Sequence, residues 1–596
     1  MRAALHALLA LVVAVPARAS DVTALLPDVQ VEVRARSAWP AKLNKGWGPL
    51  RLELHNRGDQ PARLRLGATA ADWQNERTFR QSFELAPGER VDTELVLPAG
   101  GQWEQEWSVR LRSQRSDDWT EHNLLGCGGE ADYRAVLAVS DRPVVQSTVA
   151  QWSERLSRRA VTSYTSAGRP AVSDDMQVGH ARYEDLARSW AAYTSLDLVL
   201  IDARSELPPE ARLEAIAAWV RSGGVLLVAG ARGHALALER GSLAPWLEER
   251  FRAPHVARDA QSCGLGLLVF HPTDEWIDDA DLRDAAYELA TAEQHMAPRL
   301  DGTSRASEAP ILLPGIGEIP HRVFLLLLIL FGVLIGPVNF LWIARKGRPV
   351  LLLVTIPAIA LVTTLALLAY GIWFQGLDVK VASQSMTFLD ERLHRSSCVE
   401  RRRVYAGMSP GAGLRPEAGT ALHFLTSTGG GGGVPRVRSR LHIEKDPTLV
   451  LAGDYLPTRV PVEHILQSER AARGRLEASR VDGVLSVRNG LGARIESLVA
   501  RDERGRWYSS EGLIEAGASA MLAPMDAPPD HTLASEPADI LWQSDQRSRG
   551  ELIPAATYLA RLEHSPFRDD CGIETNEVSG HHRVLGVLDL QSEEWK

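Results

Sequence analysis

This chain of 596 residues lacks the common signatures of metal, nucleotide and nucleic-acid binding. Its four cysteines never occur as C-x-x-C or with another zinc-type spacing. Its 66 Lys and Arg residues are outnumbered by 75 Asp and Glu residues and form no basic stripe, which argues against a nucleic-acid partner. The Gly264-Leu265-Gly266 stretch enters a predicted strand instead of a helix, so it is no phosphate-binding fingerprint. We therefore expect neither a metal nor a cofactor.

The N-terminus has the pattern of a secretory signal peptide. Arg2 is followed by the apolar run Ala3 to Val15, and Ala17-Arg18-Ala19 is a small-x-small cleavage pattern. An uncleaved N-terminal anchor is the alternative. Both interpretations place the domain that follows outside the cytoplasm.

Two long runs without a single charge interrupt the second half of the chain. Residues 323–344 and 350–374 are each long enough to cross a hydrocarbon core of roughly 30 Å as a helix. The connector between them carries Arg345, Lys346 and Arg348, and basic residues in short loops mark the cytoplasmic side. The pattern predicts a transmembrane hairpin with a cytoplasmic turn, and Asn339 in the first run is a candidate hydrogen-bonding partner for the second helix. A buried hairpin inside a soluble protein is the alternative.

The regions next to this hairpin are rich in predicted β-strands. Residues 29–35 alternate apolar and polar side chains, and several similar segments follow up to about residue 115. Strand patterns return after the second apolar run and include a glycine run at 429–433 that is most simply a flexible loop. We expect a β-sandwich in the N-terminal part, and one or two further β-rich domains at the C-terminus. The stretch "LELHNRGD" resembles immunoglobulin-like modules of extracellular proteins.

Between these regions, apolar strands alternate with helical patterns. Strands are expected near 135–141, 196–203, 225–230 and 264–270, and helices over 181–193 and 208–224, among others. Apolar runs without alternation fit strands that are buried on both faces. The order predicts a mostly parallel α/β sheet.

The α/β region resembles the class I glutamine amidotransferase-like fold. The resemblance rests on "LDLVLIDA" and "AAWVRSGGVLLVAG", covers residues 133–295, and is to degenerate versions in bacterial membrane proteins that also carry β-rich domains and transmembrane spans. Active members have a cysteine on the sharp turn after a strand. Here that turn reads Ala231-Arg232-Gly233. The missing nucleophile argues against enzyme activity.

The whole pattern predicts a multidomain chain that combines α/β and all-β domains with a two-helix hairpin. The expected parts are a signal peptide (1–19), a β-sandwich (20–125), the α/β domain (126–295), a linker (296–322), two spans (323–344 and 350–374) around a cytoplasmic turn (345–349), and a C-terminal β-rich region (375–596).

Asp141 and Asp202 are the candidate ligand-site residues, because both follow predicted parallel strands and open α/β sheets bind ligands at that edge. Acidic residues that simply begin solvated loops are the alternative. His180 and His234 are isolated, and nothing in the sequence assembles a nucleophile, base and orienting group.

The four cysteines allow three disulfide pairings in an exported protein. The domain layout favours Cys127 with Cys263 and Cys398 with Cys571.

Two functions follow. The first is a non-catalytic envelope protein of the bacterial inner membrane, with both large regions extracytoplasmic, that acts as a scaffold or accessory subunit for protein partners. The second is an outward-facing ligand sensor or hydrolase that uses the α/β domain. A transporter ranks below both, because neither span contains an ionisable residue.

Overall fold

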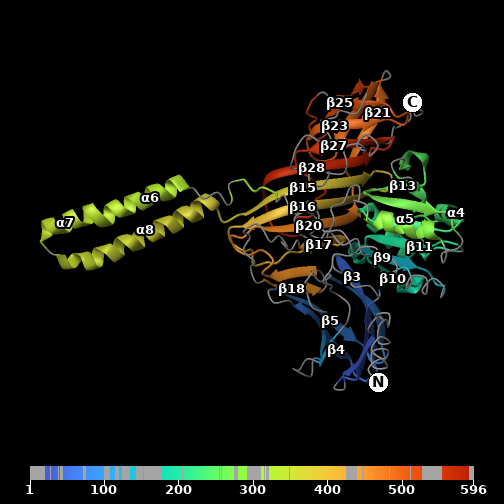
Figure 1. Cartoon of the computed structure of the whole chain (residues 1–596), viewed down its shortest axis with the longest axis horizontal. Helices are drawn as coiled ribbons and strands as arrows, with labels where there is room; N and C mark the ends of the chain where they lie inside the picture. The colour runs from blue at the N-terminus through green and yellow to red at the C-terminus, as the bar shows by residue number, and fades with distance from the viewer. Residues whose placement is uncertain are drawn as a thin grey trace, which may run out of the picture.

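The fold is described from a computed structural model of the chain (Figure 1). The described residues are 21–26, 29–37, 39, 45–71, 75–98, 108–113, 120–123, 134–142, 152, 176–204, 206–253, 256, 258–273, 279–291, 311–314, 316, 321–347, 349–424, 439–445, 449–481, 484–510, 512–526 and 553–588. The expected signal peptide, Cys127 and the glycine run at 429–433 lie outside them.

The N-terminal strands form two sheets, here called the sandwich. One sheet has the order β1-β2-β3-β6, with strands β1 (Asp21–Leu26), β2 (Val31–Ser37), β3 (Trp47–Asn56) and β6 (Arg90–Pro98). The other has the order β19-β18-β5-β4-β7-β8, with strands β4 (Ala62–Ala71), β5 (Asn75–Leu85), β7 (Ser108–Ser113), β8 (Thr120–Asn123), β18 (Ser439–Lys445) and β19 (Leu449–Gly453). Alternating burial along β3 shows the period of two that the sequence predicted.

This second sheet corrects the predicted domain division. Strands β18 and β19 follow the hairpin in the chain, yet β18 pairs in parallel with β5, with Thr78 opposite His442. The C-terminal region is therefore not a set of separate β domains, because part of it completes the N-terminal sandwich.

The α/β sheet has the order β10-β9-β11-β12-β14-β13 and is parallel except for β13. Its strands are β9 (Arg134–Val139), β10 (Met176–Ala181), β11 (Leu198–Asp202), β12 (Val225–Ala229), β13 (Asp259–Cys263) and β14 (Gly266–His271). Its described helices are α3 (Glu210–Arg221), α4 (Gly233–Leu238) and α5 (Ala280–Thr291), with short 3-10 turns η4 (Ala244–Trp246) and η5 (Glu249–Phe251). The predicted parallel α/β sheet is confirmed, whereas membership of the amidotransferase-like family stays a prediction.

The helix predicted over 181–193 is wrong. That stretch ends β10 and then forms two 3-10 turns, η2 (Tyr183–Asp185) and η3 (Trp190–Ser195). Spacings of three and four residues between apolar side chains suit short 3-10 turns as well as an α-helix. Leu186, Ala187 and Tyr193 are buried, so tertiary packing uses the same apolar residues without a continuous helix.

The rest of the C-terminal region forms a nine-stranded sheet, here called the long sheet, and a three-stranded sheet. The long sheet has the order β17-β20-β16-β15-β28-β27-β23-β24-β26, with strands β15 (Val379–Asp390), β16 (Arg395–Ala406), β17 (Thr420–Phe424), β20 (Val462–Ala471), β23 (Ile495–Arg501), β24 (Trp507–Ser509), β26 (Ala523–Met525), β27 (Thr557–Leu562) and β28 (Asn576–Val587). The small sheet contains β21 (Arg475–Val481), β22 (Val484–Gly490) and β25 (Ser519–Met521).

The sandwich, the α/β sheet and the long sheet meet at Trp47. Its indole Nε1 donates to the Leu422 carbonyl at 3.0 Å, and its backbone N–H donates to Thr194 Oγ1 at 3.0 Å. The preceding Gly46 has φ +66°, and a Cβ there would lie 2.4 Å from the carbonyl carbon of Thr194. A single buried apolar cluster accordingly contains residues of all three units, which we call the body.

Buried ion pairs also cross these junctions. Lys45 of the sandwich pairs with Asp197, which leads into β11, and both side chains are about 95% buried. Arg221 at the end of α3 contacts Glu469 of β20 at 2.9 Å. Buried pairs give little net stability, but removing one partner leaves an uncompensated charge.

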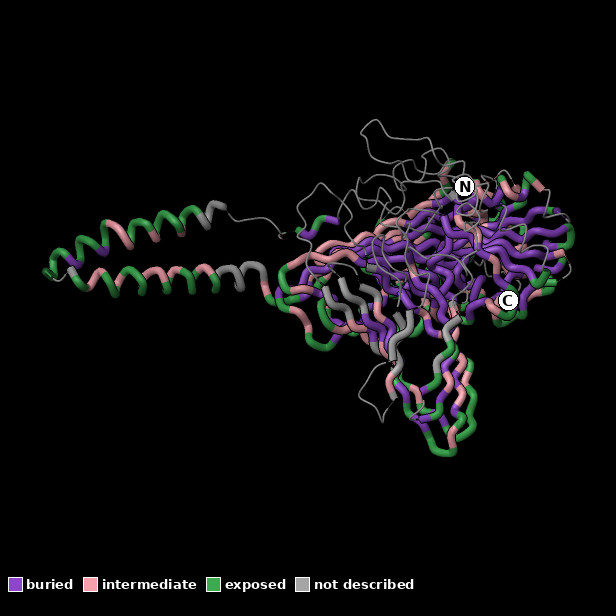
Figure 2. The backbone as a smooth tube through the Cα atoms, turned by 60° about the horizontal axis from the view of Figure 1, so that its bottom comes forward, coloured by how far each residue is buried: buried purple, intermediate pink, exposed green. Residues whose placement is uncertain are grey.

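The predicted hairpin is confirmed as two helices long and apolar enough to cross a membrane. The first consists of α6 (His321–Val333), a π-helical turn η7 (Leu334–Val338) and α7 (Asn339–Lys346). The second consists of the short η8 (Pro349–Leu351) and α8 (Leu352–Gln375). Gly347, with φ +64°, ends α7 in the left-handed conformation and makes the turn tight. Figure 2 shows the hairpin exposed over most of its length, in contrast to the buried sheets of the body.

Proline and asparagine mark the first helix of the hairpin. Pro337 has no N–H and its ring crowds the preceding turn, which accounts for the wider π-helical turn around it. Asn339 is buried, as expected for a residue that faces the second helix, but its Nδ2 has no hydrogen-bond partner among the described residues.

We predict that Asp197→Ala destabilises the body by about 3 kcal/mol, because it leaves the Lys45 ammonium buried without the carboxylate it pairs with. The measurement is urea unfolding of the full chain in detergent, followed by tryptophan fluorescence. The matched control is Glu84→Ala, which breaks an exposed pair with Arg63 and should have little effect. Equal effects of the two substitutions would contradict the stabilising role of the buried pair of Lys45 with Asp197.

Candidate functional site

The predicted ligand site lies at the carboxyl edge of the α/β sheet. The chain runs from β9 to β10 on one side and then to β11 on the other, so the strand order reverses between β9 and β11. Ligands of open α/β sheets bind at such a switch point. Asp141 follows β9 and Asp202 ends β11, so both candidate residues lie at this edge, as predicted.

Asp202 is held by the protein itself. Its Oδ2 accepts hydrogen bonds from Ser140 Oγ at 2.9 Å and from Arg204 Nη2 at 2.7 Å, and the residue is only 4% exposed. Burial raises the pKa of the Asp202 carboxyl, but the hydrogen bonds from Arg204 and Ser140 outweigh burial and bring this pKa below its usual range. The Asp202 carboxylate therefore orders the loop after β11. Because its oxygens already accept hydrogen bonds from the protein, it gives no evidence for a ligand.

Tyr183 closes the same edge. Its hydroxyl donates to the Asp202 carbonyl at 2.8 Å, and its backbone N–H donates to Asp141 Oδ1 at 3.0 Å. The tyrosine is 9% exposed, and burial raises the pKa of its hydroxyl. The side chain that follows β10 thus occupies the switch point, where a ligand would otherwise sit.

The isolated histidines have structural contacts. His180 Nε2 lies 2.9 Å from the Ser140 carbonyl, and burial lowers the pKa of this imidazole. His234 lies on α4 with its ring 5.0 Å from that of Phe270. Among the described residues, neither histidine forms a hydrogen bond with a nucleophilic side chain.

The turn after β12 has the backbone of a strand–turn–helix but no nucleophile. Gly230 has φ +154°, and a Cβ there would lie 2.6 Å from the carbonyl of Ala203. Only glycine fits this close approach. Ala231 and Arg232 follow it as exposed residues before α4 begins, so the tip of the turn carries neither a thiol nor a hydroxyl.

The described cysteines are inert thiols. Cys263, Cys398 and Cys571 are buried and free, and burial raises the pKa of each thiol to about 12. The structure does not form the expected disulfide between Cys398 and Cys571. Cys571 lines a small pocket together with Arg402 of β16, whereas Cys398 lies four residues before Arg402 in that strand, about 13 Å from it at the rise of a strand. Disulfides need Cα atoms within about 7 Å.

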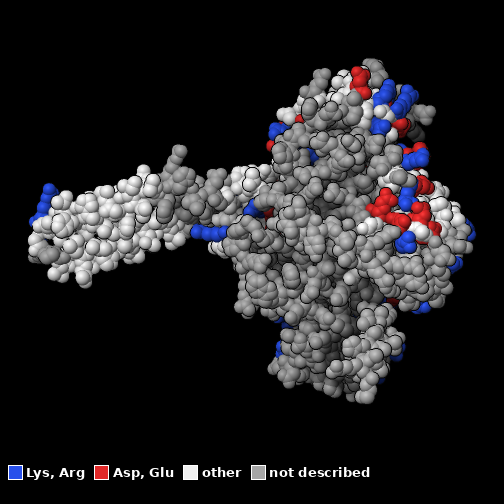
Figure 3. Space-filling model, in the orientation of Figure 1, with Lys and Arg blue, Asp and Glu red and all other residues white. Residues whose placement is uncertain are grey.

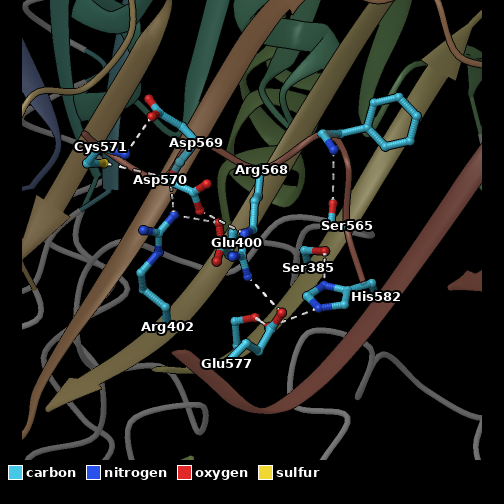
Figure 4. Close-up of polar contacts among 12 residues, drawn as sticks. Ser385, Glu400, Arg402, Ser565, Arg568, Asp569, Asp570, Cys571, Glu577 and His582 are labelled. Atoms are coloured by element: carbon cyan, nitrogen blue, oxygen red, sulfur yellow. Dashed lines mark hydrogen bonds and ion pairs between the residues drawn. The ribbon is translucent and has the colours of Figure 1, made fainter. Parts of the chain in front are cut away.

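A buried polar network on the long sheet is the feature that the sequence did not reveal (Figure 4). Ser385 of β15 lies directly opposite His582 of β28, and Ser385 Oγ is 2.8 Å from His582 Nδ1. His582 Nε2 is 3.0 Å from Glu577 Oε1, and Glu577 also accepts from Ser383 and from Arg568. Burial raises the pKa of the Glu577 carboxyl, but the hydrogen bonds from His582 and Ser383 outweigh it and lower that pKa.

The segment 563–575, here called the crossover segment, covers this network. It connects β27 to β28, and Figure 4 shows Arg568, Asp569 and Cys571 over the strands that carry Ser385 and Arg402. Arg402 donates to the Asp569 carbonyl and, at 2.7 Å, to Glu400. The contact between Arg402 and Asp569 fastens the segment to the sheet.

The serine–histidine–glutamate order resembles that of a hydrolytic triad, but the setting does not suit catalysis. A nucleophile must be reachable by substrate. Ser385 is 3% exposed, and its strand is buried along almost its whole length. We therefore assign the network to structure. Within the described residues no group of three or more His, Cys, Asp or Glu side chains is arranged to hold a metal ion.

The comparisons with known proteins add no activity. No family model and no curated protein matches the chain. Among solved structures, it is similar to a calcium-binding mutant of Bacteroides uniformis β-glucuronidase 2, with 10% identity over 33% of this chain and 23% of that chain, at a TM-score of 0.14. It is also similar to the Amycolatopsis orientalis exo-chitosanase CsxA (10%; 35% and 22%; TM-score 0.12) and to native alpha-2-macroglobulin from Escherichia coli (10%; 86% and 99%; TM-score 0.13).

The chain spans less than a quarter of the first two of these structures. Similarities with such low TM-scores give no information about the activity of this protein.

Two buried histidines of the long sheet make the body sensitive to acid. Burial lowers the pKa of His423 and of His464 to about 3. An unfolded histidine titrates near pH 6.5, so between pH 6.5 and about 3 only the unfolded chain takes up these protons. The contribution of these two histidines to the free energy of unfolding is therefore fully present above pH 6.5. It is lost as the pH falls, by roughly 1.4 kcal/mol per pH unit for each histidine.

We predict that the double substitution His423→Gln and His464→Gln makes the unfolding midpoint depend less on pH between 7.5 and 5, even if it lowers the midpoint itself. The measurement is thermal unfolding of the full chain in detergent at each pH. The exposed His564→Gln is the control and should leave the slope unchanged. A double variant with the slope of the unsubstituted chain would refute the linkage.

Proposed function

We propose that this protein is a membrane-anchored, non-catalytic scaffold or accessory subunit of a membrane complex in the bacterial envelope. The carrying observation is the pairing of β5 with β18, which joins the segments before and after the hairpin in one sheet. A chain that crosses a membrane twice returns to the side from which it left. The hairpin is then an anchor inserted into one continuous body.

The charges of the hairpin support its orientation. Its tip carries Arg345 and Lys346 (Figure 3), and the Lys346 ammonium lies 3.8 Å from the centre of the Trp342 ring. Basic short loops remain in the cytoplasm, and tryptophan prefers the membrane interface. This arrangement favours a cytoplasmic tip and an extracytoplasmic body. The Ala- and Arg-rich composition and the predicted export signal favour the bacterial inner membrane.

The α/β sheet supports a role in binding proteins and not in catalysis. Its turn after β12 has no nucleophile, and its switch point is occupied by Tyr183 and by the pair of Asp202 with Arg204. The resemblance to degenerate amidotransferase-like domains of membrane proteins agrees with this role but is an analogy.

We predict that the full chain, extracted from its native membranes after mild cross-linking, copurifies with specific membrane partners at a fixed stoichiometry. Mass spectrometry and native mass measurement check this. The variants Asp141→Ala and Asp202→Ala should retain the same partners, because neither residue acts on a substrate.

The contrary result is a chain recovered alone, together with a cellular phenotype that Asp141→Ala and Asp202→Ala abolish while the protein stays folded. That result would favour a ligand sensor or hydrolase built on the α/β sheet.

A further inference from the structure

The join between hairpin and body is very short. Helix α8 ends at Gln375, Gly376 turns the chain with φ +77°, and β15 begins at Val379. Three residues span at most about 10 Å. The headgroup layer on each side of the hydrocarbon core is roughly 5–7 Å thick. This end of the long sheet is therefore confined to the membrane surface if α8 crosses the bilayer.

The end of β16 lies at the same level. β15 and β16 are antiparallel, with Val379 opposite Ala406. The Gly407 N–H donates to the Asp378 carbonyl at 3.1 Å, and a Cβ on Gly407 would lie 2.9 Å from the Cα of Leu377. Met408 thus leaves the sheet next to Leu377, level with the end of the helix.

Exposed apolar side chains gather at this join. Leu377 is 50% exposed and Met408 is 61% exposed. Leu312, on the segment that leads into the first helix, is 80% exposed, although its neighbours Ile311 and Leu313 are buried against the long sheet. The fold therefore anchors the segment on both sides of Leu312 and leaves that side chain outside.

Basic side chains accompany these apolar ones. Lys380 lies on β15, and its side chain reaches back toward Gly376. Its Cε lies 3.9 Å from the place where a Cβ on Gly376 would be, and the Asp378 side chain is also close to that place. Arg459 is exposed, and its backbone N–H donates to the Ala406 carbonyl at 2.7 Å, which fixes it beside the end of β16. Figure 3 shows basic side chains where the hairpin meets the body.

We propose that Leu312, Leu377 and Met408, with Lys380 and Arg459, form a seat by which the body rests on the lipid surface. The apolar side chains enter the interfacial layer, and the two cations contact headgroup phosphates. The proposal rests on the membrane anchoring proposed above. A body held by this seat and by two helices has a fixed tilt on the membrane, as a scaffold that presents one face to partners requires.

The test is site-directed fluorescence quenching of the full chain in lipid nanodiscs. Cys127→Ser removes the one cysteine that lies outside the described residues. The other three cysteines are buried, so the introduced cysteine is the intended site of labelling. Met408→Cys is labelled with bimane, and Leu377→Cys serves as a second probe of the seat. The quencher is phosphatidylcholine with a nitroxide on carbon 5 of its acyl chain, in nanodiscs that also contain phosphatidylglycerol.

Two matched positions bracket the result. Leu353→Cys is an 81% exposed site within α8, and Met521→Cys is a 68% exposed site on β25, far from the hairpin in Figure 1. We expect quenching at residues 408 and 377 to exceed that at residue 521 at least threefold.

If residue 353 is quenched but residues 408 and 377 behave like residue 521, the seat is wrong and the anchor stands. If residue 353 is not quenched, the anchor itself fails and the seat fails with it.

Discussion

The structure depends on one constraint: the two chain segments that flank the hairpin must meet again in the same sheets. β18 extends the sheet that β5 began, and only three residues separate the end of the second apolar helix from the start of β15. A bilayer tolerates this arrangement only if both segments remain on one side. The hairpin therefore behaves as an insertion into a folded body and not as a linker between independent domains.

Buried polar contacts set the relative positions of the parts. Trp47 joins the sandwich to the α/β sheet and to the long sheet through two hydrogen bonds, while Arg221 and Glu469 meet across the interface of α3 with β20. Apolar burial supplies most of the stability, since it is proportional to area and does not depend on direction. Hydrogen bonds and buried ion pairs depend on geometry, so they select one arrangement of the parts.

The sequence predicted well those elements whose pattern lies within a single stretch of the chain. The charge-free runs, the helix at Glu210–Arg221 and the buried strands of the α/β sheet all lie close to their expected positions. The pairing of β5 with β18 joins segments more than 350 residues apart, and nothing in either strand specifies the other. The same holds for Ser385 and His582: alternating small polar residues on β15 indicate a polar face, but not its partner. At the candidate site, Asp141 and Asp202 could be placed at the sheet edge from the sequence, whereas Tyr183, which occupies that edge, belonged to a wrongly predicted helix.

The most direct test of the account is the sidedness of three exposed positions in sealed membrane vesicles. Asp59→Cys lies before the hairpin, Glu503→Cys lies after it, and Lys346→Cys lies at its tip; each is made in the Cys127→Ser background and treated with a membrane-impermeant maleimide. If the hairpin is inserted into one extracytoplasmic body, residues 59 and 503 react from the same side and residue 346 only from the other. Labelling of residues 59 and 503 from opposite sides, or of all three from one side, would contradict this topology.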